Sequence, residues 1–169
     1  MVVILSDREN KTEKEIIRML SALGAAVISD GKILETGSSF TVVASHRKTQ
    51  IKAKSGIVIA TDGIKKFKNQ RLPRGVIGIC SESNMSALDL FKKNGISVIT
   101  CGVGTKNTLS VSSINENGML LCLQRSIIDA NGCVLEPCEL KIKPSGKTEL
   151  FSCLAAEAVR LIYNNEAYS

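Results

Sequence analysis

The sequence predicts an α/β fold: a mostly parallel sheet flanked by helices, followed by a C-terminal antiparallel three-stranded meander and a final packing helix. The first observation is that residues 75–104 hold two short apolar runs, at 76–79 and 96–100, around a segment with apolar residues at near-helical spacing. The second is that these runs are continuous rather than alternating, which indicates strands buried on both faces of a parallel sheet. The third is that the later segments are extended and separated by turn signals, which is typical of antiparallel strands.

The first half of the chain contains several strands and one amphipathic helix. Apolar, β-branched runs predict strands at residues 2–5, 25–29, 32–34, 40–45 and 56–61. Thr12 followed three residues later by Glu15 predicts a capping box at the start of the helix, and Gly24 ends it. Residues 25–34, with Asp30-Gly31 between their two runs, predict either a strand or a small hairpin whose turn the glycine makes possible.

The second half continues with a β-α-β unit and then changes its pattern. In this unit, Asn94-Gly95 closes the helix, because glycine adopts the left-handed conformation that helix ends often need. Later strands are predicted at residues 108–114, 118–125 and 133–143, with turns at 115–118 and 129–132. Residues 148–163 carry apolar positions at helical spacing and predict a last helix that packs on the sheet. No repeat or low-complexity linker appears, so residues 1–169 are predicted to form a single domain.

The composition favours a packed protein without a membrane segment. With 169 residues, of which 44% are hydrophobic, the chain can fill a core. It has no run of about 18 uncharged apolar residues, and its first residues lead directly into charge, so the cytoplasm is the expected location. Cys80, Cys101, Cys122 and Cys153 lie in apolar stretches without a Cys-x-x-Cys motif, so reduced thiols are expected.

The positive charge is concentrated in the middle of the chain. The formal net charge is +6, but residues 47–74 hold nine Lys or Arg against a single acid, Asp62, and therefore carry +8. Such a stretch steers anions toward itself. Phe67 is its only aromatic residue, so it offers no stacking platform for bases, and nucleic acid is the less favoured partner. A solvated basic surface is the simpler interpretation.

His46 is the only histidine and follows the predicted strand at residues 40–45. No second imidazole can share a metal ion with it, and the sequence assigns it no acidic partner. Because a catalytic histidine needs an orienting partner, we predict a surface histidine here.

Two polar turns supply most of the predicted ligand-binding residues. They follow neighbouring parallel strands, and open α/β sheets bind ligands at the carboxyl ends of their strands. The predicted residues are Cys80, Ser81, Glu82, Ser83 and Asn84 in the first turn and Gly102, Gly104, Thr105 and Lys106 in the second. The alternative for the first turn is a helix cap formed by Ser83 or Asn84. No catalytic residue and no metal ligand is assigned.

Gly146-Lys147-Thr148, before the last helix, indicates phosphate binding, because N–H groups at a helix start attract anions and the lysine adds charge. A P-loop also needs a glycine five residues before Gly146, where this chain has Lys141. The P-loop signature is therefore incomplete. Lys147 and Thr148 complete the set of candidate ligand-binding residues.

Two stretches carry a family resemblance. They read Val98-Ile-Thr-Cys-Gly102 and Gly146-Lys-Thr-Glu-Leu-Phe-Ser-Cys-Leu-Ala-Ala156. With the order of elements over residues 75–163, they resemble the central, ATP-binding domain of the Mur ligases and the related folylpolyglutamate synthases. The second stretch is similar to the family's Gly-x-His-Asn-x-x-Asn-x-Leu-Ala-Ala. The resemblance implies a Mur-ligase-like domain from the ATP-dependent chemistry of bacterial peptidoglycan synthesis.

This chain departs from the family at the positions that the resemblance makes functional. Thr148-Glu149 stand where the family has His-Asn beside the nucleotide, and residues 80–83 stand where it has Asn-x-Asp-Asp. No Gly-Lys-Thr-Thr loop follows the strand at residues 2–5, although ATP-driven ligation needs a phosphate cradle and a metal site. The family's flanking substrate domains do not fit within 169 residues. The resemblance therefore implies a pseudoenzyme, a reduced relative that kept the scaffold without the ligase chemistry.

Three functions follow from these observations. The favoured one is a non-catalytic domain, without a cofactor, that binds a small ligand or a protein partner around residues 80–84 and 102–107. The first alternative is a nucleotide- or phosphate-dependent enzyme that uses Lys106, Lys147 and the basic stretch. The second is a basic nucleic-acid-binding module that uses residues 47–74. The sequence names no ligand and leaves a homo-oligomer open.

Overall fold

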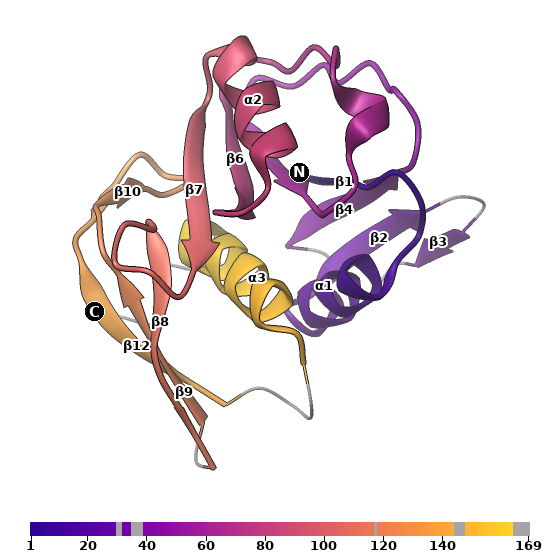
Figure 1. Ribbon diagram of the computed structural model, residues 1–169. Helices are drawn as coiled ribbons and strands as arrows, with labels where there is room; N and C mark the ends of the chain where they lie inside the picture. The colour runs from indigo at the N-terminus through magenta and orange to yellow at the C-terminus, as the bar shows by residue number, and fades with distance from the viewer. Residues whose placement is uncertain (30–31, 35–38, 117, 144–147, 164–169) are drawn as a thin grey trace.

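The computed structural model describes residues 1–29, 32–34, 39–116, 118–143 and 148–163 (Figure 1). In chain order its elements are β1 (Val2–Leu5), α1 (Lys11–Ala22), β2 (Ala25–Ser29), β3 (Lys32–Leu34), β4 (Phe40–Ser45), β5 (Gly56–Ala60), the single 3-10 turn η1 (Lys65–Phe67), β6 (Val76–Ser81), α2 (Met85–Asn94), β7 (Ser97–Gly102), β8 (Leu109–Asn115), β9 (Gly118–Leu123), β10 (Ile127–Ile128), β11 (Val134–Leu135), β12 (Cys138–Ile142) and α3 (Leu150–Tyr163). Helices are interspersed among the strands up to β7, whereas the described elements between β7 and α3 are all strands.

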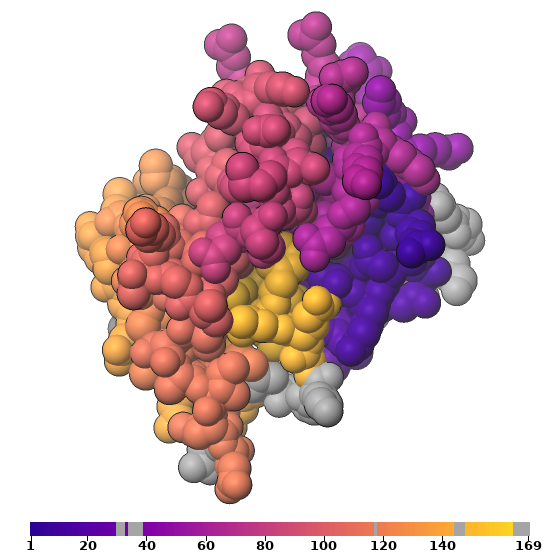
Figure 2. All heavy atoms as spheres, in the orientation of Figure 1, coloured from indigo at the N-terminus to yellow at the C-terminus, as the bar shows by residue number. Residues whose placement is uncertain are grey.

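Ten of the described strands form one mixed sheet, in the order β12-β9-β8-β7-β6-β5-β1-β4-β2-β3. Pairing is parallel from β2 across to β8 and antiparallel at both edges, where β3 joins β2 and where β9 and β12 extend β8. The predicted fold class is therefore confirmed. The β8–β9 hairpin projects from the body of the molecule (Figure 2).

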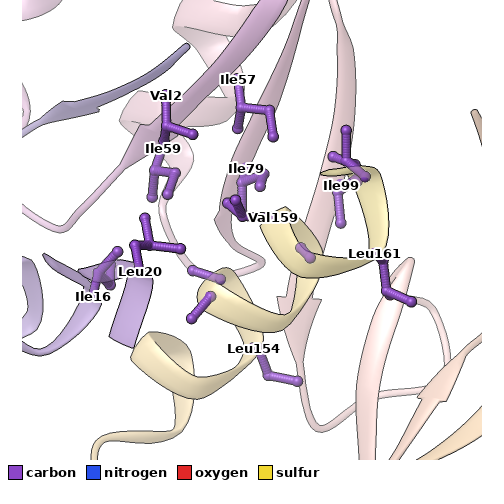
Figure 3. Close-up of a cluster of buried hydrophobic side chains, with 14 of the residues drawn as sticks. Val2, Ile16, Leu20, Ile57, Ile59, Ile79, Ile99, Leu154, Val159 and Leu161 are labelled. Atoms are coloured by element: carbon purple, nitrogen blue, oxygen red, sulfur yellow. The ribbon is translucent and has the colours of Figure 1, made fainter. Parts of the chain in front are cut away.

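Helices cover both faces of the sheet, because crossovers between parallel strands place them there. On one face, α1 and α3 pack together, and their residues Ile16 and Leu154 share an apolar cluster with Ile79 of β6 (Figure 3). On the other face, η1 and α2 contribute Phe67 and Phe91 to a second cluster.

β1 lies in the centre of the parallel part of the sheet, between β4 and β5, and is buried along its whole length. Its side chains alternate between the two faces. Val2 and Ile4 join the cluster under α1 and α3, and Val3 and Leu5 join the one under α2. A strand that serves two cores must be apolar at every position, which explains its unbroken apolar run.

The predicted β-α-β unit is present as β6, α2 and β7. The side-chain oxygen of Asn84 accepts the N–H of Ala87 at 3.1 Å, and Gly95 ends the helix with a φ of 63°. The helix-cap alternative for Asn84 is therefore confirmed. Gly78 of β6 lies against the ring of Phe91, where an added Cβ would come within 2.8 Å of ring atoms.

The predicted meander is present, but its last segment differs from the prediction. β8, β9 and β12 form the meander. The predicted strand at residues 133–143 is divided at Pro137, because proline cannot donate to a ladder. The part before Pro137 is β11, which pairs with β10 in a separate two-stranded sheet. The turn at residues 129–132 therefore joins β10 to β11 rather than β9 to the third meander strand.

Replacing Gly78 with alanine should destabilise the fold, because the new methyl group would overlap the ring of Phe91 in a filled core. We expect the free energy of unfolding to fall by about 1–3 kcal/mol, the usual cost of overpacking. Urea denaturation followed by circular dichroism measures this change. Gly104→Ala is the matched control, because its Cβ would make only ordinary contacts, at 3.5 Å from Glu82 and 3.7 Å from Asn107. Equal unfolding midpoints for the two variants would contradict the packing argument.

Candidate functional site

The carboxyl ends of the parallel strands form one edge of the sheet, and the crossovers diverge there on either side of β1. The connection after β1 leads to α1 on one face, whereas the connections after β4 and β5 pack Ile51 and Phe67 on the opposite face. Open α/β sheets bind ligands where neighbouring crossovers diverge. The topology therefore predicts a ligand site at the carboxyl edge around β1.

A buried carboxylate occupies this position. Glu13 of α1 is 1% exposed, and both of its carboxylate oxygens lie 2.9 Å from Nε2 of His46, which follows β4. The hydroxyl of Ser6, directly after β1, donates to the same carboxylate. A carboxylate out of water is costly unless it is paired and hydrogen-bonded. These three residues, Ser6, Glu13 and His46, form what we call the Glu13 hub, which ties α1 to the ends of β1 and β4.

Two predictions from the sequence are wrong at this point. His46 is not a surface histidine without an acidic partner, because its side chain is only 16% exposed and contacts Glu13. The capping box does not begin at Thr12, because Asn10 is the N-cap and its side-chain oxygen accepts the N–H of Glu13 at 2.8 Å. The helix therefore begins at Lys11, which turns Glu13 toward the interior.

Thr61, directly after β5, links the caps of two helices across the edge. The side-chain amide of Asn10 donates to the hydroxyl of Thr61 at 3.3 Å, and that of Asn84 donates to its carbonyl at 2.9 Å. Each cap therefore also donates to the strand end that lies between them. The starts of α1 and α2 are held against β5 in this way.

A cavity of about 560 Å³ opens where α1 and α3 begin, and it is lined by Asn10, Lys11, Thr12, Asp62, Thr148 and Glu149. The two helix starts are bound to each other. Thr12 donates to the carboxylate of Glu149 at 2.6 Å, and the backbone N–H of Glu149 donates to Glu15 at 2.8 Å. The second bond holds the pKa of the Glu15 carboxyl below its usual value. Lys11 pairs with Glu15 at 3.6 Å.

The start of α1 presents acceptors where a phosphate cradle presents donors. N–H groups at a helix start bind anions, but Asn10 already caps α1 from within the chain. Three carboxylates also lie at or beside this start, namely those of Glu13, Asp62 and Glu149. A polyphosphate placed here would meet like charge.

The structure brings the two predicted polar turns together. The side-chain amide of Asn107 donates to Glu82 at 2.7 Å and to the carbonyl of Gly104 at 2.9 Å. Gly102 lies beneath Glu82, since an added Cβ would overlap its carboxylate. Asn107 is 1% exposed, and its Oδ1 has no hydrogen-bond partner among the described residues. Because an unsatisfied buried acceptor costs about 1–3 kcal/mol, this atom marks unmet bonding capacity.

Other predicted residues of the two turns lie nearer the surface. The hydroxyls of Ser81 and Ser83 share a hydrogen bond of 2.9 Å, and Ser83 is exposed. Thr105 and Lys106 are also exposed, and the carbonyl of Lys106 accepts from the guanidinium of Arg125. These side chains belong to the two turns that the Glu82–Asn107 contact joins.

Cys80 and Cys101 end neighbouring strands but belong to opposite faces of the sheet. Cys80 lies in the cluster under α2, and Cys101 lies in the cluster under α1 and α3. Burial raises the pKa of the Cys80 thiol to about 12 and that of Cys101 above its usual value. Both therefore stay protonated at neutral pH and are poor nucleophiles.

Thr148 lies in a different part of the edge from the two turns, because it lines the cavity at the start of α1. Lys147, predicted with it as a phosphate contact, lies outside the described residues.

The nine Lys and Arg side chains of residues 47–74 are all exposed. Their two loops, which follow β4 and β5, are tied by Gln70, whose side chain donates to the carbonyl of Thr49 at 2.6 Å and accepts its N–H at 3.3 Å. Asn94 of α2 holds the backbone of Gln70 and Leu72. The loops that carry the basic stretch are therefore held together by hydrogen bonds, and nucleic acid stays the less favoured of the predicted partners.

Within the described parts of the chain, no three His, Cys, Asp or Glu side chains gather closely enough to hold a metal ion. The helices of these parts include none with the length and apolar character that crossing a membrane requires.

Comparison with solved structures identifies proteins of similar fold. The murein peptide ligase Mpl of Psychrobacter arcticus 273-4 matches with a TM-score of 0.57 and 11% identity, over 96% of this chain and 44% of that protein. The Neisseria meningitides ligase for UDP-N-acetylmuramate and L-alanyl-gamma-D-glutamyl-meso-diaminopimelate, also an Mpl, matches with 0.54 and 12%, over 97% and 61%. A UDP-N-acetylmuramoyl-L-alanyl-D-glutamate–2,6-diaminopimelate ligase matches with 0.53 and 7%, over 99% and 43%. No protein-family model and no curated protein matches the chain.

These structural neighbours are Mur ligases, so the resemblance predicted from the sequence is confirmed at the level of the fold. The likeness covers nearly the whole chain and extends beyond the predicted residues 75–163. The chain spans 43–61% of the length of these three proteins, at identities of 7–12%. It is therefore a Mur-ligase-like α/β chain, and a shared fold does not transfer the ligase activity.

Sequence reasoning missed the Glu13 hub. Ser6 and His46 each directly follow a predicted strand, and Glu13 stands three residues after Asn10, which is the spacing of a helix-cap pair. The missing information was that β4 pairs with β1. Asn107 was included in the expected region without a role, because no pattern distinguishes it from an ordinary loop residue.

We expect the buried contact between Glu13 and His46 to couple more strongly than a surface pair. A double-mutant cycle of Glu13→Gln and His46→Asn, measured by urea denaturation, should give about 1–3 kcal/mol, because partners in one buried network are not additive. Glu13→Gln keeps the side-chain volume and an acceptor for Ser6, so this variant should still fold. The control is the exposed pair of Lys14 and Glu9, 3.4 Å apart, with an expected coupling below about 0.5 kcal/mol. A coupling energy between Glu13 and His46 no larger than that between Lys14 and Glu9 would contradict the role of the Glu13 hub.

Proposed function

We propose that this chain is a non-catalytic Mur-ligase-like domain that binds a small, hydrogen-bond-donating ligand at the carboxyl edge of its sheet. Glu82 and Asn107 contact the ligand, and Gly102 leaves room for the Glu82 carboxylate beside Asn107. The observation that carries the proposal is the buried Oδ1 of Asn107, an acceptor without a partner among the described residues.

The orientation of the Asn107 amide follows from its neighbours. Its Nδ2 group donates to two oxygens, one from Glu82 and one from Gly104. A flipped amide would place Oδ1 against both of these acceptors and lose two hydrogen bonds. Oδ1 is therefore the atom left over, and an N–H or O–H group of a ligand would satisfy it.

The charge of the site favours a ligand rich in N–H groups. Glu82 is exposed and its carboxylate accepts hydrogen bonds only, as does the Asn107 oxygen. An ammonium or amide group would satisfy both acceptors once the exposed side chains of the turns open the way to the buried Asn107 oxygen, whereas an anion would meet the Glu82 charge. The ligand class that fits is a small primary amine or amide.

The acceptor-rich start of α1 supports the non-catalytic part of the proposal. The backbone there is capped by Asn10, and the hydroxyl of Thr12 is bound to the Glu149 carboxylate. Lys11 is paired with Glu15. Groups that would hold a triphosphate in an ATP-dependent ligase are engaged within the chain.

ATP with Mg²⁺ should therefore leave the melting temperature of the protein unchanged. Thermal denaturation with and without nucleotide measures this, since a ligand at 100 times its Kd would stabilise the fold by about 2.7 kcal/mol. A clear rise of the melting temperature that disappears in Lys11→Ala or Lys147→Ala would overturn the proposal of a non-catalytic domain and favour the nucleotide-dependent enzyme.

Gly102→Ala should weaken ligand binding by about tenfold or more, because its methyl group would push the Glu82 carboxylate away from Asn107. Binding is measured by the NMR shift of the Asn107 side-chain NH₂ signal during titration with a panel of small primary amines and amides. Gly104→Ala is the control, because it makes only ordinary contacts and should bind as the wild type does. Equal binding by both variants, or shifts caused only by matched carboxylates, would refute the proposed site.

A further inference from the structure

A second cavity lies at the opposite end of the sheet, where β5, β6 and β7 begin. Its volume is about 560 Å³, which falls within the usual range for small-molecule sites. Its apolar wall is built largely from six isoleucines: Ile57, Ile77, Ile99, Ile127, Ile128 and Ile162. We propose that this amino-edge cavity binds a small molecule with an apolar body and a single carboxylate.

The cavity exists because β8 begins late. Among the described residues, β7 pairs with β8 only at Cys101 and Gly102, so the first half of β7 has no strand on that side. The β10 segment and the last turn of α3 enclose the space instead. Figure 3 shows Ile57 and Ile99 on two of the strands that line it, beside α3. The unpaired edge of β7 therefore borders an apolar cavity, and a small ligand can occupy the space that a neighbouring strand would otherwise fill.

The walls of the cavity are fixed before any ligand enters. Tyr163 stacks on Phe40 with ring centroids 5.0 Å apart, and its hydroxyl accepts from the Met1 amine at 2.8 Å and donates to the Met1 carbonyl at 3.1 Å. At the mouth, Gly75 lies directly against the carbonyl of Lys54, where any Cβ would overlap that oxygen. A preformed site loses little conformational entropy on binding, which favours affinity.

The charges on the cavity wall favour an anion. Arg74, before β6, and Arg125, after β9, both line the cavity and are both exposed. Asp129 is the one acidic side chain among the described lining residues, and its Oδ1 accepts the backbone N–H groups of Asn131 and Cys133 at 2.9 and 2.7 Å. Positive charge is therefore in excess.

Arginine is also the side chain best suited to a carboxylate. A guanidinium has five N–H donors in a planar fork, so Arg125 can hold the Lys106 carbonyl and still donate to a ligand. Two such groups at the mouth of an isoleucine-lined hollow fit a molecule whose apolar end enters and whose carboxylate stays outside.

Titration of the whole protein with octanoate, followed by the isoleucine methyl signals in NMR, tests this proposal. We expect saturable shifts of the lining isoleucines, such as Ile77 and Ile128, and no shift of Ile64, which does not line the cavity and packs in the cluster on the other face of the sheet. Octanol, which has the same chain without the charge, should bind about tenfold more weakly. Arg74→Met should lower the affinity for octanoate by about tenfold.

The control variant is Arg71→Met, an exposed arginine of the same loop that does not line this cavity and should leave octanoate binding unchanged. Equal binding of octanol and octanoate, or equal losses in the Arg71 and Arg74 variants, would overturn the proposal. The absence of saturable shifts at about 5 mM octanoate would overturn it as well. Thr108, beside Asn107, also lines the cavity, but Arg74 and Ile77, which this test measures, lie at the amino end of β6. The octanoate outcomes are therefore distinguishable from those of the titration at Asn107.

Discussion

The burial of one carboxylate fixes how α1 meets the sheet. Glu13 is removed from water and needs donors, and these come from Ser6 after β1 and His46 after β4. The two strands are neighbours only because β4 inserts between β1 and β2. A slip of α1 by one residue would turn the carboxylate by about 100° and carry it away from both donors. The Glu13 hub therefore sets the register of α1, and with it the geometry of the adjoining carboxyl edge.

The Glu13 hub is one of several features that place hydrogen-bond acceptors and negative charge at the carboxyl edge. The positive ends of α1 and α2 both point to the carboxyl edge, and helix starts of this kind can bind phosphates. This chain satisfies them with its own acceptors, the caps Asn10 and Asn84, and places Glu13 and Glu149 beside the start of α1. The bonding capacity that remains unmet belongs to an acceptor, Oδ1 of Asn107. An edge arranged in this way favours a donor rather than an anion.

Features that depend on nearby residues could be predicted from the sequence, and features that depend on strand order could not. The β6-α2-β7 unit and its cap at Asn84 follow from patterns within about 30 residues of chain. The contact between Glu13 and His46 spans 33 residues and needs the pairing of β1 with β4, which hydrophobic periodicity does not encode. The division of the predicted third meander strand at Pro137 could have been predicted from the sequence, since proline cannot donate to a strand ladder.

The proximity of the two predicted polar turns could be predicted from the sequence. The contact between Glu82 and Asn107 could not, because it depends on the path of the loop after β7. Both turns follow adjacent parallel strands, so their proximity was expected. Asn107 is buried because residues 103–108 fold back along β7, where the N–H of Thr108 reaches the carbonyl of Thr100 at 3.1 Å. The same return delays β8, which leaves the first half of β7 unpaired and opens the amino-edge cavity. Both candidate sites are thus consequences of one offset, the late start of β8, which buries an unsatisfied amide at one end of β7 and exposes a strand edge at the other.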